Sequence, residues 1–360
     1  MSRKPETVSR LKTIEDVDVN GKKVLVRLDL DVPLEKVKGK RQKVKIADET
    51  RLLNSLPTIQ YLVDRKAKIT IIGHLGRPGG KRVEELSLKP VADWFEDKFP
   101  GAGIKVEDNL RFDPGEEADS PTFAQNIVRR LLPDVYIFDA FASYRPHTSV
   151  VLVPKLVSEV AIGFRFAAEI SHLSKVLENP QKPVIFILGG AKADTKIALI
   201  PKLATQADEV LIGGLIGSKV QESTKMYLPA DATHQALQAG KKVQEGYDSK
   251  LRIAELRQDG LDITAKSAKV FADKIMRAGT VVWNGPMGKF VDGKHSAGTE
   301  VVARAMNQTK AYTVAGGGDT EAALTALGLE SGIDWISSGG GAMLYYLANG
   351  TLPFLEALER

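Results

Sequence analysis

Short apolar segments that end in glycine recur along the chain, and this pattern limits its fold more than any other feature. The segments between them are long enough for helices, and strands that alternate with helices are typical of parallel α/β sheets. A helical spacing of apolar residues between Leu52 and Val63, interrupted by Pro57, predicts one such helix. The predicted strands are residues 23–28 (KVLVRL), 68–72 (KITII), 135–138 (VYIF), 184–188 (VIFIL), 209–212 (EVLI), 280–283 (TVVW), 311–315 (AYTVA) and 335–337 (WIS).

Glycine-rich turns directly follow six of these strands. They read GHLGRPGG (73–80), GGAKADTK (189–196), GGLIG (213–217), NGPMG (284–288), GGGDT (316–320) and SGGGA (338–342). In a doubly wound sheet, ligands bind at the carboxyl ends of the strands, where glycine lets the backbone approach an anion. Five turns follow residue 180, so the second half is predicted to bind a nucleotide. Glycine is also ordinary turn chemistry, and the chain contains no Walker sequence.

The length of the chain predicts two domains, because 360 residues exceed the usual size of one core. The sequence contains no cysteine, which excludes disulfides and thiolate zinc sites. It has no apolar run long enough for a membrane span, and its first residues lack the apolar core of a secretory signal. We therefore expect a soluble, cytoplasmic protein with no membrane partner.

The net charge of +5 fits two classes of protein. A basic chain suits nucleic-acid binding, and it equally suits an enzyme whose cleft attracts phosphorylated anions. The densest basic run, residues 36–45 (KVKGKRQKVK), has no interleaved aromatic residues. We interpret it as an exposed loop or hairpin and expect no nucleic-acid partner.

The turns of the second half contain polar residues suited to phosphate. If a helix begins after Gly190, Lys192 and Lys196 lie four residues apart on one face of its first turn. Cations are unfavourable there unless an anion binds nearby, so we interpret both as phosphate ligands. Asp319 is a predicted N-cap, and it is also a candidate ligand of Mg²⁺. The glycines at 339–341 precede another helix and would offer free amides to a transferring phosphoryl group.

The first half places a different set of polar residues near the ends of predicted elements. Arginines recognise carboxylate and phosphate through paired hydrogen bonds, so four of them near strand ends favour an acidic ligand. Each of these residues alone is compatible with an ordinary surface role. The set comprises Asp29, Asp31, Arg51, His74, Arg77, Arg111, Arg145 and His147.

Taken in order, eight motifs closely resemble those of phosphoglycerate kinases. They are RLDLDVP (27–33), GHLGRP (73–78), DNLRF (108–112), DAFASYRPH (139–147), GGAKADTKI (189–197), WNGPMGKF (283–290), GGGDT (316–320) and SSGGGA (337–342). The resemblance extends from about residue 20 to the C-terminus. It implies two Rossmann-like parallel-sheet domains joined by a hinge. Residues 1–166, with 352–360 packed back onto them, would bind 3-phosphoglycerate, and residues 167–351 would bind the nucleotide.

The resemblance also implies an activity: reversible phosphoryl transfer between 1,3-bisphosphoglycerate with ADP and 3-phosphoglycerate with ATP. The transfer would be in line, with Mg²⁺ bound to the nucleotide, after hinge closure in a monomeric enzyme. By similarity the acid substrate would contact Asp29, Asp31, Arg51, His74, Arg77, Arg111 and Arg145. The nucleotide would contact Lys192, Lys196, Asn284, Gly317, Gly318, Asp319, Thr320 and Gly339, with Asp319 on the metal. Arg51, Lys196, Gly340 and Gly341 would stabilise the moving phosphoryl group.

Three positions depart from the family pattern. Asp31 stands where the family has an amide, and it would repel an anionic substrate unless it pairs with an arginine. Tyr144 replaces a histidine before Arg145. Val291 replaces a glutamate that receives the ribose hydroxyls, although Asp292 is adjacent. These departures keep open a second hypothesis, a paralogue that binds phosphometabolite or nucleotide without turnover. A basic nucleic-acid-binding protein is the third.

Overall fold

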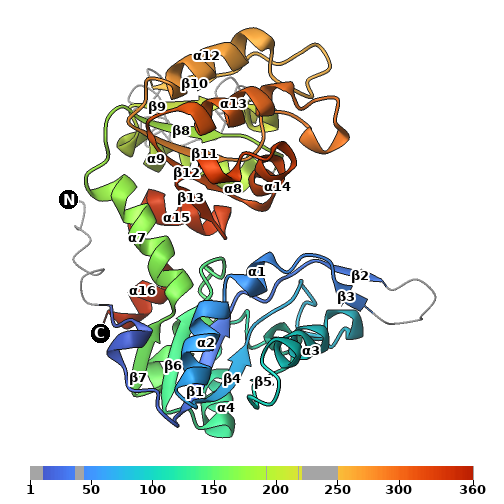
Figure 1. Cartoon of the computed structure of the whole chain (residues 1–360), viewed down its shortest axis with the longest axis vertical. Helices are drawn as coiled ribbons and strands as arrows, with labels where there is room; N and C mark the ends of the chain where they lie inside the picture. Colours follow the sequence, from blue (N-terminus) through green and yellow to red (C-terminus); the bar gives the residue numbers. More distant parts are fainter. Residues whose placement is uncertain (1–10, 37–43, 192, 218, 221–249, 360) are drawn as a thin grey trace, which may run out of the picture. The chain divides into compact units, whose positions relative to one another are not determined.

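A computed structural model of the chain describes residues 11–36, 44–191, 193–217, 219–220 and 250–359 (Figure 1). It divides into two compact units. The first contains residues 1–171 together with 351–360, and the second contains residues 172–350. The division falls within one helix, α7 (Phe164–Glu178), which carries the chain from the first unit into the second.

The first unit is built on a five-stranded sheet in the order β5-β4-β1-β6-β7, with every neighbouring pair parallel. Its strands are β1 (Lys23–Leu28), β4 (Lys68–Ile72), β5 (Lys105–Val106), β6 (Val135–Asp139) and β7 (Glu159–Ile162). The three strands predicted here are confirmed. The predictions missed β5, which has only two residues, and β7 (EVAI), which begins with a charged residue and has only half-buried residues in its first half.

Helices cover this sheet, and the helix predicted between Leu52 and Val63 is divided in two. α1 (Thr50–Leu53) ends before Ser55, and α2 (Leu56–Asp64) begins directly after it, with Pro57 in its first turn. Proline is tolerated there because its missing N–H would have no intrahelical partner. The longer helices are α3 (Lys89–Lys98) and α4 (Pro121–Leu131); the shorter elements are α5 (Thr148–Val151), α6 (Val153–Leu156), η2 (Ile14–Asp16), η3 (Glu84–Leu86) and η4 (Leu110–Phe112).

The last residues of the chain return to the first unit. In α16 (Pro353–Leu358), the ring of Phe354 stacks on Phe138 of β6 with centroids 4.0 Å apart. Phe354 also meets the edge of Phe166 in α7, at 5.6 Å. An antiparallel hairpin, β2 (Leu34–Lys36) with β3 (Val44–Ile46), flanks the basic run, of which residues 37–43 lie outside the described part.

The second unit has a six-stranded parallel sheet in the order β10-β9-β8-β11-β12-β13. Its strands are β8 (Val184–Leu188), β9 (Glu209–Ile212), β10 (Leu251–Ile253), β11 (Thr280–Asn284), β12 (Tyr312–Gly316) and β13 (Trp335–Ser337). The five predicted strands of this half are confirmed, and the three-residue β10 was missed. The helices are α8 (Ala193–Ile197), α9 (Ile200–Gln206), α12 (Ala265–Ile275), α13 (Ala297–Gln308), α14 (Gly318–Leu327) and α15 (Gly340–Asn349), with η5 (Phe290–Asp292) and η6 (Glu330–Gly332).

Each unit has its own apolar core on its sheet. The first is formed by strand residues such as Val26, Ile71 and Ile137, and the second includes Ile187 and Trp283. Strands buried on both faces explain why the predicted segments read as continuous apolar runs. Among the described residues, no helix is long and apolar enough to cross a membrane.

Candidate active site

In the first unit, four parallel strands end at the same edge of the sheet, and their loops contain the predicted polar set. Asp29 and Asp31 follow β1, His74 and Arg77 follow β4, Arg111 follows β5, and Arg145 follows β6. Arg51 joins them from α1. The topology therefore places on one edge residues that are more than 100 positions apart in the sequence.

A fully buried arginine that sequence reasoning missed lies at the centre of this edge. Arg27 of β1 is 0% exposed, and its guanidinium donates to Ser149 Oγ at 3.1 Å, to Ser143 Oγ at 3.2 Å and to the Leu28 carbonyl. Its Nη2 also lies 2.8 Å from His74 Nδ1. One signal in the sequence could have identified Arg27: it is a charged residue inside an apolar strand. Charged residues are rarely buried without partners.

The position of His74 fixes its charge state. It is buried beside Arg27 and near Arg111, and burial followed by these cations holds its pKa well below the usual value. His74 is therefore neutral at pH 7. A neutral imidazole with Nδ1 facing Arg27 accepts a hydrogen bond there and carries its own proton on Nε2, which is then the donor.

Asp29 connects the loop after β1 to the loop after β6. It accepts hydrogen bonds from the Ala142 N–H at 2.7 Å and from Ser143 Oγ at 2.8 Å. Burial raises its pKa, and the positive charges of Arg51 and Arg27 oppose that rise. Both carboxylate oxygens are thus engaged in holding the 140–143 loop.

The extra carboxylate, Asp31, is paired. Its Oδ2 lies 3.9 Å from Arg51 Nη1, and its Oδ1 accepts a hydrogen bond from the Gly76 N–H at 2.8 Å. Arg51 Nη1 also donates to the Asp31 carbonyl at 2.9 Å. This is the arrangement under which we expected Asp31 to be compatible with an anionic substrate.

The remaining basic residues differ in burial. Arg111 is nearly buried, donates to the Gly76 carbonyl at 2.8 Å and lies 3.0 Å from Glu117, and burial lowers its pKa. Burial, with the Arg111 charge, lowers the pKa of His147 to about 4. Arg77 and Arg145 are exposed, and Arg145 lies over the ring of Tyr144 at 5.9 Å. The edge therefore combines two buried, hydrogen-bonded arginines, Arg27 and Arg111, with two exposed ones.

In the second unit, two glycine turns meet where β8 and β11 lie side by side and the strand order reverses. The Gly189 N–H donates to the Asn284 carbonyl at 2.9 Å, and the Gly190 N–H donates to the Pro286 carbonyl at 2.7 Å. A Cβ on Gly189 would lie 2.5 Å from Met287 Cε and would collide with the Pro286 carbonyl. Only glycine permits this approach, and such a switch point is where open α/β sheets bind ligands.

Lys196 points its ammonium group into this junction. It lies on α8, and its Nζ donates to the Gly189 carbonyl at 2.7 Å and to the Asn284 carbonyl at 3.3 Å. α8 begins at Ala193, so Lys196 is the fourth residue of the helix. Lys192 lies outside the described residues.

Asn284 connects three of the turns. Its Nδ2 donates to the Gly316 carbonyl at 2.5 Å, and a Cβ on Gly317 would lie 2.9 Å from the same atom. A Cβ on Gly340 would collide with it and would lie 2.6 Å from Gly317 Cα. Asn284 Oδ1 is buried and has no hydrogen-bond partner among the described residues, so the site retains a spare acceptor.

The prediction that Asp319 is the N-cap of its helix is wrong. α14 begins at Gly318, and the cap is Gly317, whose φ of 103° favours glycine. Asp319 is therefore an exposed residue in the first turn, where the helix dipole stabilises its negative charge. Thr320 is fully buried, and its Oγ1 accepts a hydrogen bond from the Gly285 N–H at 2.7 Å.

Two helix N-termini open onto these turns. Gly317 is the cap before Gly318 of α14, and Gly339 is the cap before Gly340 and Gly341 of α15. The first N–H groups of a helix have no intrahelical acceptor and carry the positive end of its dipole. Together with Lys196 they are hydrogen-bond donors of the kind that suits phosphate oxygens.

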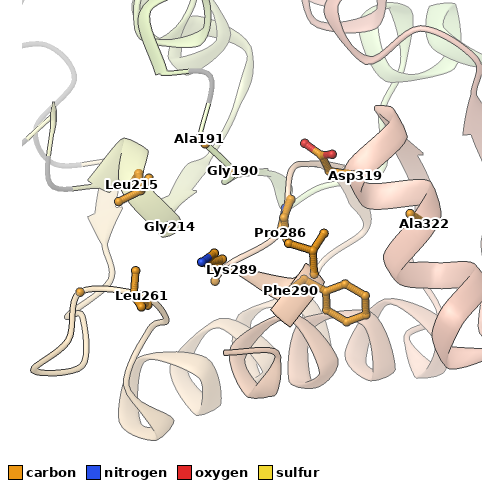
Figure 2. Close-up of a pocket in the computed structure, with 13 residues that line it drawn as sticks. Gly190, Ala191, Gly214, Leu215, Leu261, Pro286, Lys289, Phe290, Asp319 and Ala322 are labelled. Atoms are coloured by element: carbon orange, nitrogen blue, oxygen red, sulfur yellow. The ribbon is translucent and has the colours of Figure 1, made fainter. Parts of the chain in front are cut away.

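A cavity of about 220 Å³ lies beside the turns. Figure 2 shows Leu215 and Leu261 lining one side and Pro286, Phe290 and Ala322 the other, with Asp319 at one end. Lys289 and Asp319 supply the only charged side chains of the described lining. An apolar slot beside glycine turns suits a flat ring joined to phosphates.

Val291 lines the same cavity and is 85% exposed. The neighbouring Asp292 is engaged with residues just after it. Its Oδ2 lies 2.7 Å from His295 Nδ1, and its Oδ1 accepts hydrogen bonds from the Lys294 and His295 N–H groups. The hydrogen bond with His295 is the main cause that lowers its pKa to about 2.

The matching family model, two sequence relatives and a solved structure all carry the same family name. The family model described as phosphoglycerate kinase matches residues 14–108, 102–220 and 216–350. A phosphoglycerate kinase of Bdellovibrio bacteriovorus is 35% identical over 400 residues, covering 97% of both chains, and one of Aquifex aeolicus is 35% identical over 405 residues, covering 97% of this chain and 98% of the relative. The solved phosphoglycerate kinase of Coxiella burnetii is 30% identical with a TM-score of 0.79, covering 97% of this chain and 98% of the other.

Proposed function

This chain belongs to the phosphoglycerate kinase family, and from that premise we propose how its two units divide the work. The activity is reversible phosphoryl transfer between 1,3-bisphosphoglycerate with ADP and 3-phosphoglycerate with ATP, a step of glycolysis and gluconeogenesis. The first unit would bind the acid substrate, and the second would bind the nucleotide. The observation that carries this proposal is the pair of sheet edges: a basic edge in one unit, and glycine turns with two helix N-termini in the other.

The basic edge of the first unit matches a small, strongly anionic metabolite. Arg51 and Arg111 are held by backbone carbonyls and carboxylates, so their remaining N–H groups are already oriented for a ligand. Neutral His74 adds a donor on Nε2 without adding charge. Exposed Arg77 and Arg145 would complete the recognition of phosphate and carboxylate. Asp29 would act indirectly, by holding the loop that carries Arg145.

The turns of the second unit match a nucleoside di- or triphosphate. The apolar slot would hold the base and ribose, and the N-termini of α14 and α15 would hold the phosphates. Lys192 would join them. Asn284 and Thr320 would act mainly as positioning residues, because each joins neighbouring turns.

The chemistry requires positioning and charge neutralisation more than covalent help. Lys196 would donate to the transferring group, and Gly340 and Gly341 would present amides to its oxygens. Arg51 would meet the same group from the substrate side. Because these residues belong to different units, we propose that transfer follows a hinge closure that also excludes water.

Magnesium is a proposed companion of the nucleotide. Mg²⁺ usually binds through one or two carboxylates together with substrate phosphates, and Asp319 offers one exposed carboxylate at the end of the cavity. No group of three or more metal-binding side chains occurs among the described residues. When bound, the ion would neutralise phosphate charge.

A coupled assay with MgATP and 3-phosphoglycerate tests the proposal. We expect turnover that requires both substrates and is abolished by chelating Mg²⁺. Folded protein that binds either ligand without turnover would instead support the impaired paralogue. Sedimentation of the same preparation tests a further proposal taken from the family, a monomeric state. Fractionation of the cells that produce the protein tests another, a cytoplasmic location.

The exposed Val291 predicts weak contact with ribose. Replacing Val291→Glu is expected to lower the KM for ATP about tenfold, because a hydrogen bond to a charged group contributes about 1.5 kcal/mol or more. The KM for 3-phosphoglycerate should stay the same. 2′,3′-Dideoxy-ATP should gain nothing, since it lacks both hydroxyls, and Val291→Gln should gain less than Val291→Glu with ATP. An equal gain for dideoxy-ATP would contradict the assignment.

A further inference from the structure

The first turn of α7 is capped by side chains from elsewhere in the first unit. The residue before the helix is Gly163, which has no side chain to accept from the free N–H groups. Thr58 Oγ1 of α2 accepts the Phe164 N–H at 3.0 Å, and Asp139 Oδ1, at the end of β6, accepts the Phe166 N–H at 2.7 Å. Thr58 Oγ1 donates in turn to Asp139 Oδ2 at 2.6 Å.

The arrangement is buried and closely packed. Thr58 is 0% exposed and Asp139 is 4% exposed. A Cβ on Gly163 would lie 2.5 Å from Asp139 Cβ, so only glycine can bring the backbone this close to the Asp139 side chain. A capping group normally comes from the helix's own N-terminus, whereas here it ties the helix to a strand end and to a second helix.

Asp139 is mostly ionised above pH 7. Burial raises its pKa to about 6, Asp29 adds to that rise, and Arg165 and the two hydrogen bonds oppose it. Above that pH its hydrogen bonds are charge-assisted and stronger than neutral ones. The carboxylate thus binds the first turn of α7 more firmly than an uncharged acceptor would.

The same carboxylate adjoins the substrate edge. Only two residues separate Asp139 from Ala142, whose N–H donates to Asp29. In the other direction, α7 leaves the first unit after Ser171 and continues into the second. Thr58 and Asp139 therefore stand between the loop proposed to bind the acid substrate and the helix that leads to the nucleotide-binding unit.

We propose that Thr58 and Asp139 are a positioning pair for phosphoryl transfer, which fixes the start of α7 on the first unit and so limits the paths along which the second unit can approach. The proposal rests on the proposed division of substrates between the units. Neither residue is assigned contact with a ligand. Weakening the pair should therefore lower kcat and leave the affinity for each separate ligand unchanged.

The sharpest test compares Thr58→Val with Thr58→Ser. Valine keeps the shape of threonine and loses the hydroxyl, whereas serine keeps the hydroxyl. We expect Thr58→Val to lower kcat about tenfold or more, with the Kd of 3-phosphoglycerate and of MgADP, each measured alone by calorimetry, within about twofold of wild type. Thr58→Ser should retain kcat.

Thr148→Val is the matched control. Thr148 is also fully buried, and its Oγ1 accepts the Ser120 N–H and donates to the Gly115 carbonyl, with no bond to α7. The Thr148→Val variant loses a comparable buried hydroxyl and should retain the wild-type kcat. If Thr58→Val does not fold, Asp139→Asn, which keeps the shape and loses the charge, gives the same comparison.

A distance measurement separates this proposal from the proposed function. Because the chain has no cysteine, single cysteines at exposed Lys89 and Lys266 label one unit each. With both ligands bound, we expect a narrow distance distribution in wild type and Thr58→Ser, and a broader one in Thr58→Val. Wild-type kcat and distances in Thr58→Val and Asp139→Asn would overturn the proposal. Wild-type protein without turnover would overturn the proposed function, while the distances would still report on α7.

Discussion

Replacing Lys196→Ala is expected to lower kcat by about a thousandfold and to change either KM by less than about threefold. Removing one preorganised donor from developing charge typically costs a factor of about 100 to 1,000. Lys196 Nζ is held by the Gly189 and Asn284 carbonyls at the junction of two glycine turns, so its position is fixed before a ligand arrives. A donor that acts on the moving group lowers kcat, whereas one that only binds the ground state raises KM.

Steady-state kinetics in both directions, with circular dichroism to verify folding, measure this effect. Lys202→Ala is the matched control, because Lys202 lies on α9 of the same unit and its Nζ donates to the side chain of half-buried Asn349 at 2.6 Å. It should retain wild-type kcat. A large rise in KM for ATP with little change in kcat would contradict the transition-state role of Lys196.

Replacing Gly340→Ala is expected to lower kcat/KM for ATP by about 100-fold. The added Cβ would collide with Asn284 Nδ2 and lie 2.6 Å from Gly317 Cα. Overpacking of this kind costs about 1–3 kcal/mol, and relief requires the first turn of α15 to move away from the other two turns. Because backbone donors act only at short range, a shift of this size would separate their amides from the phosphates.

The neighbouring Gly318→Ala distinguishes a steric effect from loss of glycine itself. A Cβ on Gly318 meets nothing within 4 Å, although this residue too lies at a helix N-terminus. Its effect on kcat/KM should be at least tenfold smaller than that of Gly340→Ala. Similar losses in both variants would show that the contact with Asn284 is not the cause.

The strands and their glycine turns were predictable because their causes are local. A parallel strand buried on both faces needs a continuous apolar segment, and all eight predicted segments are strands. The resemblance of eight motifs identified the family, and the comparisons confirm it. The missed strands β5, β7 and β10 have two to four residues, and pairing with longer neighbours specifies them.

The errors and omissions within the site have non-local causes. Aspartate is a common N-cap residue, which favoured Asp319. The three turns that approach one another around Asn284 instead make Gly317 the N-cap of α14. Arg27 was missed because its role depends on Ser143 and Ser149. Asp31 was a source of expected repulsion until the structure placed it beside Arg51.

The sequence by itself determined the α/β class, the family and the types of residue at the strand ends. The spacing of apolar residues, the residues of a turn and each single motif can be read from a short stretch of chain. Only the tertiary structure decided which polar group partners which. Partners such as Arg27 and Ser149 are 122 positions apart, and the pairing of β1 with β6, together with the position of α5, brings them within hydrogen-bonding distance. Burial makes each of these pairings necessary for stability. A buried polar group without a partner has lost its hydrogen bonds to water, and this loss costs free energy.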